Sequence, residues 1–133
     1  MSISILIVED SATQARKLTK SLESSGFSVE TAGEGAAGLA AVRSVRPDLV
    51  ISDIVMPVMD GYEMCRRIKA DERLKETPVI LLTSLSDPED VIRGLECGAD
   101  GFTVKTGSDT PVLQAIERFF HSRELAAGSQ DPS

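Results

Sequence analysis

The chain has 133 residues, and 41% hydrophobic with 26% charged residues indicates one globular domain rather than a disordered chain. Its formal net charge of −7 argues against a nucleic-acid-binding surface, which needs clustered lysine and arginine. No apolar run approaches the ~20 residues that cross a bilayer, and no basic segment precedes the first apolar run, so we expect a cytoplasmic protein without a signal peptide.

Five short apolar runs predict β-strands. They cover residues 4–8, 28–32, 48–52, 79–83 and 102–104. The runs at 4–8, 48–52 and 79–83 are almost continuously apolar, which is typical of parallel strands covered on both faces. A helical pattern follows each run, and five such pairs predict an α/β fold with a parallel sheet and right-handed crossovers. We expect the domain to span residues 1–125, followed by a disordered tail at 126–133.

The expected helices have recognisable start signals. Ser11, with a glutamine three positions later, forms a capping-box pattern. Asp60 is expected to cap the third helix, and Thr110 to cap the fifth directly before a proline. Cys65 and Cys97 fall in helical patterns and are expected to be buried free thiols. The residues expected on the apolar helix faces are Ala15, Leu18, Leu22, Leu39, Ala40, Val42, Met64, Ile68, Ile92, Leu95, Leu113, Ile116 and Phe120.

Polar side chains stand at the carboxyl ends of four predicted strands, the edge at which functional sites lie in such sheets. Glu9 and Asp10 follow the first strand, Asp53 the third, Thr83 closes the fourth and Lys105 follows the fifth. Three neighbouring carboxylates repel one another unless a cation lies among them, and oxygen ligands at a hydrated site suit Mg²⁺, which commonly also binds phosphate oxygens. Lys105 and Thr83 would then face a phosphoryl group, which an aspartate carboxylate can itself accept as the nucleophile.

The segments that contain these residues resemble the receiver domain of two-component response regulators, of the chemotaxis-receiver type. They read ILIVEDS at the first strand, PDLVISDIVMPVMDGYE around the third, PVILLTS at the fourth and GADGFTVK at the fifth. The resemblance runs from about residue 3 to 122, and the order and spacing of the segments make it specific. It implies a single doubly wound, flavodoxin-like (βα)5 domain with the strand order 2-1-3-4-5.

The resemblance also implies a phosphoacceptor site. Asp53 would take a phosphoryl group from the phosphohistidine of a kinase, and Lys105 would neutralise the phosphoryl oxygens. Asp10 and Asp53, with the backbone carbonyl of Val55, would hold Mg²⁺, while Glu9 would act mainly through water. This arrangement makes chemical sense because phosphoryl transfer asks a protein mainly for positioning and for positive charge.

The resemblance further implies a switch and a set of partners. The Thr83 hydroxyl would move to a phosphoryl oxygen while the Phe102 ring turns inward, which changes the surface of the fourth helix, fifth strand and fifth helix. The expected partners are a sensor histidine kinase or histidine phosphotransfer protein, and a downstream effector domain or protein. A homodimer is one expected state of the activated protein, whereas direct nucleic-acid contact and membrane insertion are not expected. The domain would catalyse only its own phosphorylation and dephosphorylation and would otherwise not be an enzyme.

The resemblance also implies that two positions border the approach of a hydrolytic water, and both are apolar here. They are Val55, two residues beyond Asp53, and Leu85, two residues beyond Thr83. Neither side chain can orient water by hydrogen bonding, so we expect slow self-dephosphorylation.

One position departs from the family pattern, because Thr106 follows Lys105 where the family usually has a proline, commonly after a cis peptide bond. A cis bond before another residue costs ~2.5–4 kcal/mol, so either the chain tolerates that strain or Lys105 enters from a different loop. One alternative function is a flavin- or nucleotide-binding protein on the same architecture, although the acidic loop VEDSATQ argues against it. The other alternative is a receiver-like interaction module that is not regulated by phosphorylation.

Overall fold

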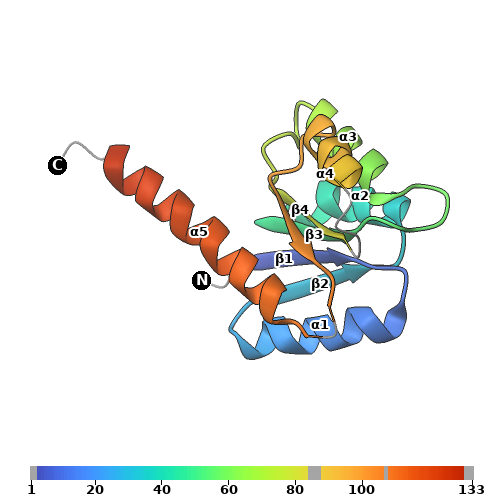
Figure 1. The fold of residues 1–133 in the computed structure, drawn as a ribbon, viewed down its shortest axis with the longest axis horizontal. Helices are drawn as coiled ribbons and strands as arrows, with labels where there is room; N and C mark the ends of the chain where they lie inside the picture. Colours follow the sequence, from blue (N-terminus) through green and yellow to red (C-terminus); the bar gives the residue numbers. More distant parts are fainter. Residues whose placement is uncertain (1–2, 84–87, 107, 131–133) are drawn as a thin grey trace.

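The computed structural model describes residues 3–83, 88–106 and 108–130, which form a five-stranded sheet and five helices (Figure 1). The elements are β1 Ser4–Val8, α1 Ala12–Ser24, β2 Ser28–Ala32, α2 Gly35–Val45, β3 Leu49–Asp53, α3 Gly61–Ala70, β4 Val79–Thr83, α4 Pro88–Glu96, β5 Gly101–Val104 and α5 Thr110–Gln130. All neighbouring strands are parallel, in the order β2-β1-β3-β4-β5. The predicted fold class and strand order are confirmed.

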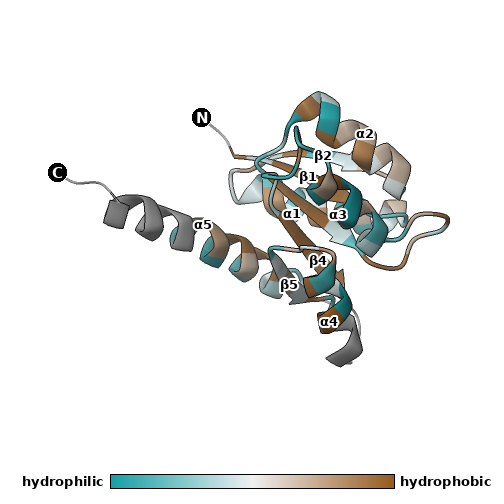
Figure 2. Cartoon of the chain, turned by 90° about the horizontal axis from the view of Figure 1, so that it is seen from above, coloured by the Kyte–Doolittle hydropathy of each residue, from teal (hydrophilic) through white to brown (hydrophobic). Residues whose placement is uncertain are grey.

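The sheet is covered on both faces by helices. On one face an apolar cluster joins the strands to α2, α3 and α4, and on the other face a second cluster joins them to α1 and α5 (Figure 1). Figure 2 shows the hydrophobic colour along the middle of the sheet, between the two layers. The chain winds from β1 outward to β2 and then crosses to β3, so the strand order reverses between β1 and β3. In sheets of this type the crevice for a ligand lies at the carboxyl ends of the strands at this reversal.

The helix caps agree with the sequence pattern, with one difference in detail. The Ser11 hydroxyl accepts a hydrogen bond from the backbone N–H of Gln14 at 3.3 Å, and Asp60 Oδ1 accepts one from the N–H of Glu63 at 2.8 Å. The N–H of Ser11, however, donates to Glu9 Oε1 at 3.1 Å. The return bond of the expected capping box is thus made by a site residue.

The apolar face expected for the fourth helix is wrong. Ile92 and Leu95 are 53% and 64% exposed, whereas Gly94 and Cys97 face the interior. Gly94 lets α4 approach the rest of the domain closely, and the larger Ile92 and Leu95 are left outside. In the second helix Ala40 is also exposed, in contrast to the expected face.

Both cysteines are buried free thiols, as expected, and burial, together with the neighbouring Cys97, raises the pKa of the Cys65 thiol. The last helix begins at Thr110, which therefore lies inside the helix instead of capping it from outside. The helix continues to Gln130, past the domain boundary expected at residue 125, and residues 131–133 lie outside the described part of the chain. Within the described part, no helix is both long and apolar enough to cross a membrane.

Candidate functional site

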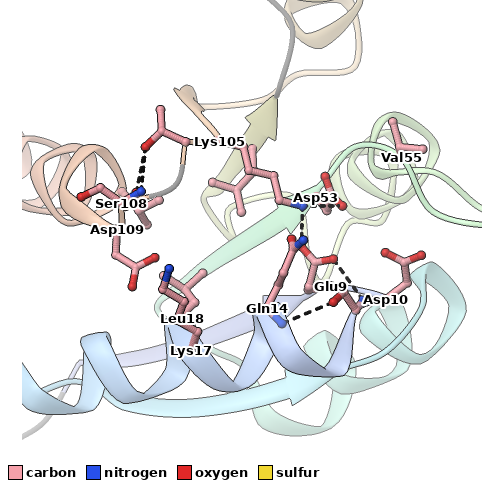
Figure 3. A pocket seen from close by; sticks show the side chains of 14 residues that line it. Glu9, Asp10, Gln14, Lys17, Leu18, Asp53, Val55, Lys105, Ser108 and Asp109 are labelled. Carbon is pink, nitrogen blue, oxygen red and sulfur yellow. Dashed lines mark hydrogen bonds and ion pairs between the residues drawn. The ribbon is translucent and has the colours of Figure 1, made fainter.

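A cavity of about 710 Å³ opens at the carboxyl ends of the central strands (Figure 3). Glu9, Asp10 and Asp53 lie on one side of it, with Val55 beside them, and Lys105 contributes to its wall. The other side is formed mainly by α1 and the loop before α5, with Gln14, Lys17, Leu18, Ser108 and Asp109. The predicted acidic residues and the predicted lysine are therefore brought together from three different strand ends.

The acidic side of the cavity is built by two neighbouring strands. Glu9 directly follows β1 and Asp53 is the last residue of β3, and both are buried, whereas Asp10 is exposed. One carboxylate oxygen from each of the three residues lies within 4.8 Å of the others. Three carboxylates at this spacing repel one another, and such a set of oxygen ligands suits a hard divalent cation.

Lys105 is the cation that contacts two of these carboxylates. Its Nζ donates to Glu9 Oε2 at 2.9 Å and to Asp53 Oδ2 at 3.1 Å. Partial burial lowers the pKa of the Lys105 ammonium, but the hydrogen bonds and charges of Glu9 and Asp53 outweigh it, so the pKa is raised. Burial raises the pKa of Glu9 above its ordinary value, although the hydrogen bonds from Lys105 and from the Ser11 N–H oppose this.

Lys105 reaches the site although threonine follows it. Its backbone N–H donates to the carbonyl of Thr83 at 2.6 Å, which extends the pairing of β4 with β5, and the described residues contain no cis peptide bond. The loop beyond it is held by hydroxyl groups. Thr106 Oγ1 accepts from the N–H of Ser108 at 3.1 Å, and the Ser21 hydroxyl of α1 donates to Asp109 Oδ2 at 2.5 Å. Sequence reasoning missed this last contact, since no local pattern links residues 88 positions apart.

The loop between β3 and α3 lies directly against the acidic cluster and is closely packed. The N–H of Gly61 donates to the carbonyl of Ile54 at 2.9 Å, and a Cβ atom at position 61 would overlap the carbonyl oxygen of Asp53. A Cβ at Gly35 of α2 would lie 2.6 Å from the carbonyl oxygen of Met59 in the same loop. These glycines are required for close approach, and they fix the path of the chain that leaves Asp53.

The same loop contains a residue in an unusual conformation. Val58 has φ +69°, and the N–H of Met59 donates to the carbonyl of Pro57 at 2.8 Å across it. This two-residue hydrogen bond around a positive φ is a γ-turn of the rare, strained kind, and a β-branched residue there is an outlier. The Val58 side chain is fully exposed, so no packing within the chain compensates for the strain.

The two residues expected to form a switch lie beside this cavity. Thr83 is the buried last residue of β4, and Phe102 lies in β5, where it pairs with Leu81. Neither is among the described residues that line the cavity. The Phe102 ring packs instead into the cluster beneath α4, against Gly94.

Comparison with known proteins places the chain among signalling domains. The family model of the response regulator receiver domain matches residues 5–117. The DNA-binding response regulator MtrA of Mycobacterium tuberculosis is 43% identical over 101 residues, which cover 76% of this chain and 43% of MtrA. The response regulator PleD of Caulobacter vibrioides is 38% identical over 116 residues, which cover 87% of this chain and 26% of PleD. The chain thus spans less than half the length of these curated relatives.

Solved structures show the same similarity over nearly the whole length of both compared chains. The signal receiver domain of a signal transduction histidine kinase from Syntrophus aciditrophicus is 46% identical, with a TM-score of 0.82 over 91% of this chain and 92% of that chain. The chemotaxis response regulator CheY4 of Vibrio cholerae is 33% identical, with a TM-score of 0.83 over 89% and 98%.

Proposed function

The chain belongs to the response regulator receiver domain family of two-component signalling systems, and from this premise we propose that Asp53 is the side chain that accepts the phosphoryl group. The observation that carries the proposal is the pair of contacts made by Lys105, at 2.9 Å to Glu9 and 3.1 Å to Asp53. They hold an ammonium group beside the Asp53 carboxylate at the end of a rigid strand. A receiver domain serves signalling rather than metabolic catalysis. We propose that this domain catalyses its own phosphorylation and dephosphorylation.

The proposed reaction is an in-line displacement at phosphorus. A carboxylate oxygen of Asp53 forms the new O–P bond, the P–N bond of the donor phosphohistidine breaks, and the imidazole nitrogen keeps the electron pair. Lys105 lies within reach of the oxygens of the transferred group and offsets their charge, which is the main service that phosphoryl transfer needs from a protein. Glu9 holds the same ammonium from its other side, so the lysine is in position before the donor arrives.

The carboxylate cluster fits a magnesium ion, because three oxygen ligands converge within 4.8 Å. We propose that Asp10, Asp53 and the backbone carbonyl of Val55 would hold Mg²⁺ directly, and that Glu9 would act through water. When bound, the ion supplies positive charge for the phosphoryl oxygens.

The proposed output is a change at the surface of α4, β5 and α5, governed by Thr83 and Phe102. This surface carries the exposed side chains of Ile92, Leu95 and Val104, which are available to a partner. We propose a sensor histidine kinase or histidine phosphotransfer protein as the donor, and an effector domain or protein, or a second activated copy, as the recipient of the signal. The reaction would take place in the cytoplasm, and neither nucleic acid nor membrane would contact this domain directly.

Mass spectrometry after treatment with acetyl phosphate and Mg²⁺ tests the assignment. The intact mass should rise by one phosphoryl group, and Asp53→Asn should remove the gain. Asp48→Asn, directly before the opposite end of β3, is the matched control and should keep the gain in mass. An undiminished gain in Asp53→Asn would contradict the assignment.

A second candidate function is a receiver-like interaction module that phosphorylation does not regulate. Thr106, in place of the proline that usually follows the lysine in the family, is the observation that favours it. Under this alternative, neither acetyl phosphate nor beryllofluoride would modify the wild-type protein, although Lys105 contacts Asp53 directly.

A further inference from the structure

Gly94 occupies a position in α4 that a larger residue could not share with Phe102. A Cβ atom at position 94 would overlap Cε1 and Cζ of the Phe102 ring. Glycine is the least favourable residue of a helix interior after proline, and Gly94 has no need of an unusual backbone conformation, since its φ is not positive. The reason for glycine here is therefore the close approach of the ring to the helix backbone.

The ring that lies on Gly94 belongs to the strand next to Thr83. Phe102 pairs with Leu81 across β4 and β5, and Thr83 follows two residues later. Alternate residues of a strand point to the same face, so Thr83, like Leu81 and the ring, belongs to the face that α4 covers. A movement of the Thr83 side chain therefore changes the space next to the ring.

Among the side chains of α4 that the structure describes, at residues 92–96, few others contact the interior of the domain. Gly94 is buried, as is Cys97 directly after the helix, and Arg93 lies over the Tyr62 ring of α3, with its guanidinium carbon 4.5 Å from the ring centroid. The larger apolar side chains of the described part of α4, Ile92 and Leu95, point outward. The contact of the Phe102 ring with Gly94 therefore contributes to the place of α4.

We propose that Gly94 is a positioning residue that couples the Phe102 ring to α4. We assign the arrangement seen here, in which Lys105 contacts Asp53 Oδ2 directly, to the unmodified acceptor. In this arrangement the ring uses the space that glycine leaves open. A side chain at position 94 expels the ring, so it favours the arrangement in which the ring has left α4 and disfavours the one seen here. The functional part of this inference rests on the proposed role of Asp53, whereas the steric part does not.

The steric part is tested by a double-mutant cycle in urea denaturation. Gly94→Ala should lower the urea midpoint when phenylalanine occupies position 102. In a Phe102→Ala background the same change should leave the midpoint unchanged or raise it, since alanine is the better helix former. Gly101→Ala is the matched control, because its Cβ would meet only Ile80 Cγ1 at an ordinary 3.5 Å, and it should cause no loss.

The double-mutant cycle shows whether the Phe102 ring is the obstacle even if one variant is unstable. Should Gly94→Ala fail to fold, the double variant folds if the ring is the obstacle and stays unfolded if it is not. Equal losses from Gly94→Ala in both backgrounds would overturn the inference.

The functional part is tested by ¹⁹F NMR of protein labelled with fluorophenylalanine. The chain has four phenylalanines, and Phe102→Leu identifies the resonance of position 102. Beryllofluoride with Mg²⁺ should shift that resonance in the wild type, and Gly94→Ala without beryllofluoride should shift it in the same direction. Because coupling is reciprocal, Gly94→Ala should also bind beryllofluoride about fivefold more tightly or better, the lower end of typical coupling between sites.

The possible outcomes separate this inference from the proposed function. If beryllofluoride binds the wild type but Gly94→Ala neither shifts the resonance nor changes the affinity, the coupling through Gly94 is wrong and the acceptor site stands. If beryllofluoride does not bind the wild type at all, the proposed acceptor function fails, and the urea cycle alone decides whether Gly94 positions the ring. Signals of bound fluoride are identified in a sample without fluorophenylalanine.

Discussion

Glu9 and Asp53 place two carboxylates where water has little access, and Lys105 is the cation that contacts both. Burial of a charge is costly unless it is paired, so each of the three groups depends on the others. Burial raises the pKa of Glu9 against the effect of its contact with Lys105, whereas the contacts with Glu9 and Asp53 raise the pKa of Lys105 against the effect of burial. At the scale of single residues, the charges of the site are therefore paired only with one another until a cation or a phosphoryl group binds.

Val58 provides a residue-scale prediction about strain. Its φ of +69° is unfavourable for a β-branched residue, and its side chain is fully exposed, so replacement loses no packing. Val58→Asn should raise the free energy of unfolding by about 1 kcal/mol, because asparagine tolerates positive φ. Urea denaturation measures the change. The same substitution at Val45, in the last turn of α2, should lower stability slightly, and equal effects at both positions would contradict this account of the strain.

Val55 provides a prediction about the lifetime of the phosphorylated state. Its side chain is 72% exposed and lines the cavity beside Asp53, where it cannot orient a water molecule. Leu85, the second position expected to border the water, lies outside the described residues. Val55→Asn combined with Leu85→Glu should accelerate loss of the phosphoryl group severalfold, while uptake at Asp53 continues.

The decay of the phosphorylated mass after removal of acetyl phosphate measures this lifetime. Val45→Asn, an exposed valine outside the cavity, is the control and should leave the decay unchanged. A decay in the double variant as slow as that of the wild type would show that the apolar side chains do not limit hydrolysis.

At the scale of helices and strands, Lys69 connects the end of α3 to two neighbouring segments. Its Nζ donates to Asp100 Oδ2 at 2.7 Å and to the carbonyl of Thr77 at 2.8 Å, and Asp100 Oδ2 also accepts from the N–H of Val79. Lys69→Met should lower the free energy of unfolding by about 2 kcal/mol, since it removes the cation beside the Asp100 carboxylate and one donor to the Thr77 carbonyl. Lys75→Met, which removes an exposed ion pair, should cost less than about 1 kcal/mol. Equal losses in urea denaturation would show that Lys69 contributes no more than a surface charge.

The elements show how far sequence reasoning reaches in this fold. The strands at 4–8, 28–32 and 79–83 have the expected bounds. Strand β3 begins and ends one residue later than expected, at Leu49 and Asp53, since Asp53 still pairs with Leu82 although its side chain is polar. The face of α4 was wrong because the spacing of large apolar residues does not reveal that a glycine is needed for a ring from another strand.

The acidic part of the site was predictable for a topological reason. Parallel strands bring their carboxyl ends to one edge, so Glu9, Asp10 and Asp53 had to meet once the strands were identified. The contact of Ser21 with Asp109 and the close approach of Gly35 to Met59 were not predictable in this way. They depend on how side chains from separate segments pack, which no local spacing encodes.

At the scale of the whole molecule, the last helix and the carboxylate cluster are the features that reach beyond a single element. Helix α5 extends beyond the sheet, away from the other helices (Figure 1). The chain covers 43% of MtrA and 26% of PleD, so more than half of each of these relatives lies outside the matched region. The carboxylate cluster links the site to the stability of the whole fold. Its members come from two strands that are neighbours only in the folded state.

Magnesium should therefore stabilise the whole domain. A ligand that binds only the folded state raises the free energy of unfolding by RT ln(1 + [L]/Kd), or about 2.7 kcal/mol when its concentration is 100 times Kd. Asp10→Ala should lose most of this increment, since it removes one of the three converging carboxylates. The same variant should be more stable than the wild type without metal, because one repelling charge is gone. Thermal melts with Mg²⁺ and with a chelator measure both effects.

The control for this prediction is Glu76→Ala, which removes an exposed acid from the loop before β4, at the opposite edge of the sheet. It should keep the full magnesium increment, because a change in overall charge alone alters the attraction of a cation only weakly at physiological salt. If Asp10→Ala and Glu76→Ala respond to Mg²⁺ alike, the metal does not bind at the cluster and the proposed ligands are wrong. If Asp10→Ala loses the increment without gaining stability in the chelator, Lys105 already compensates the repulsion among the three carboxylates.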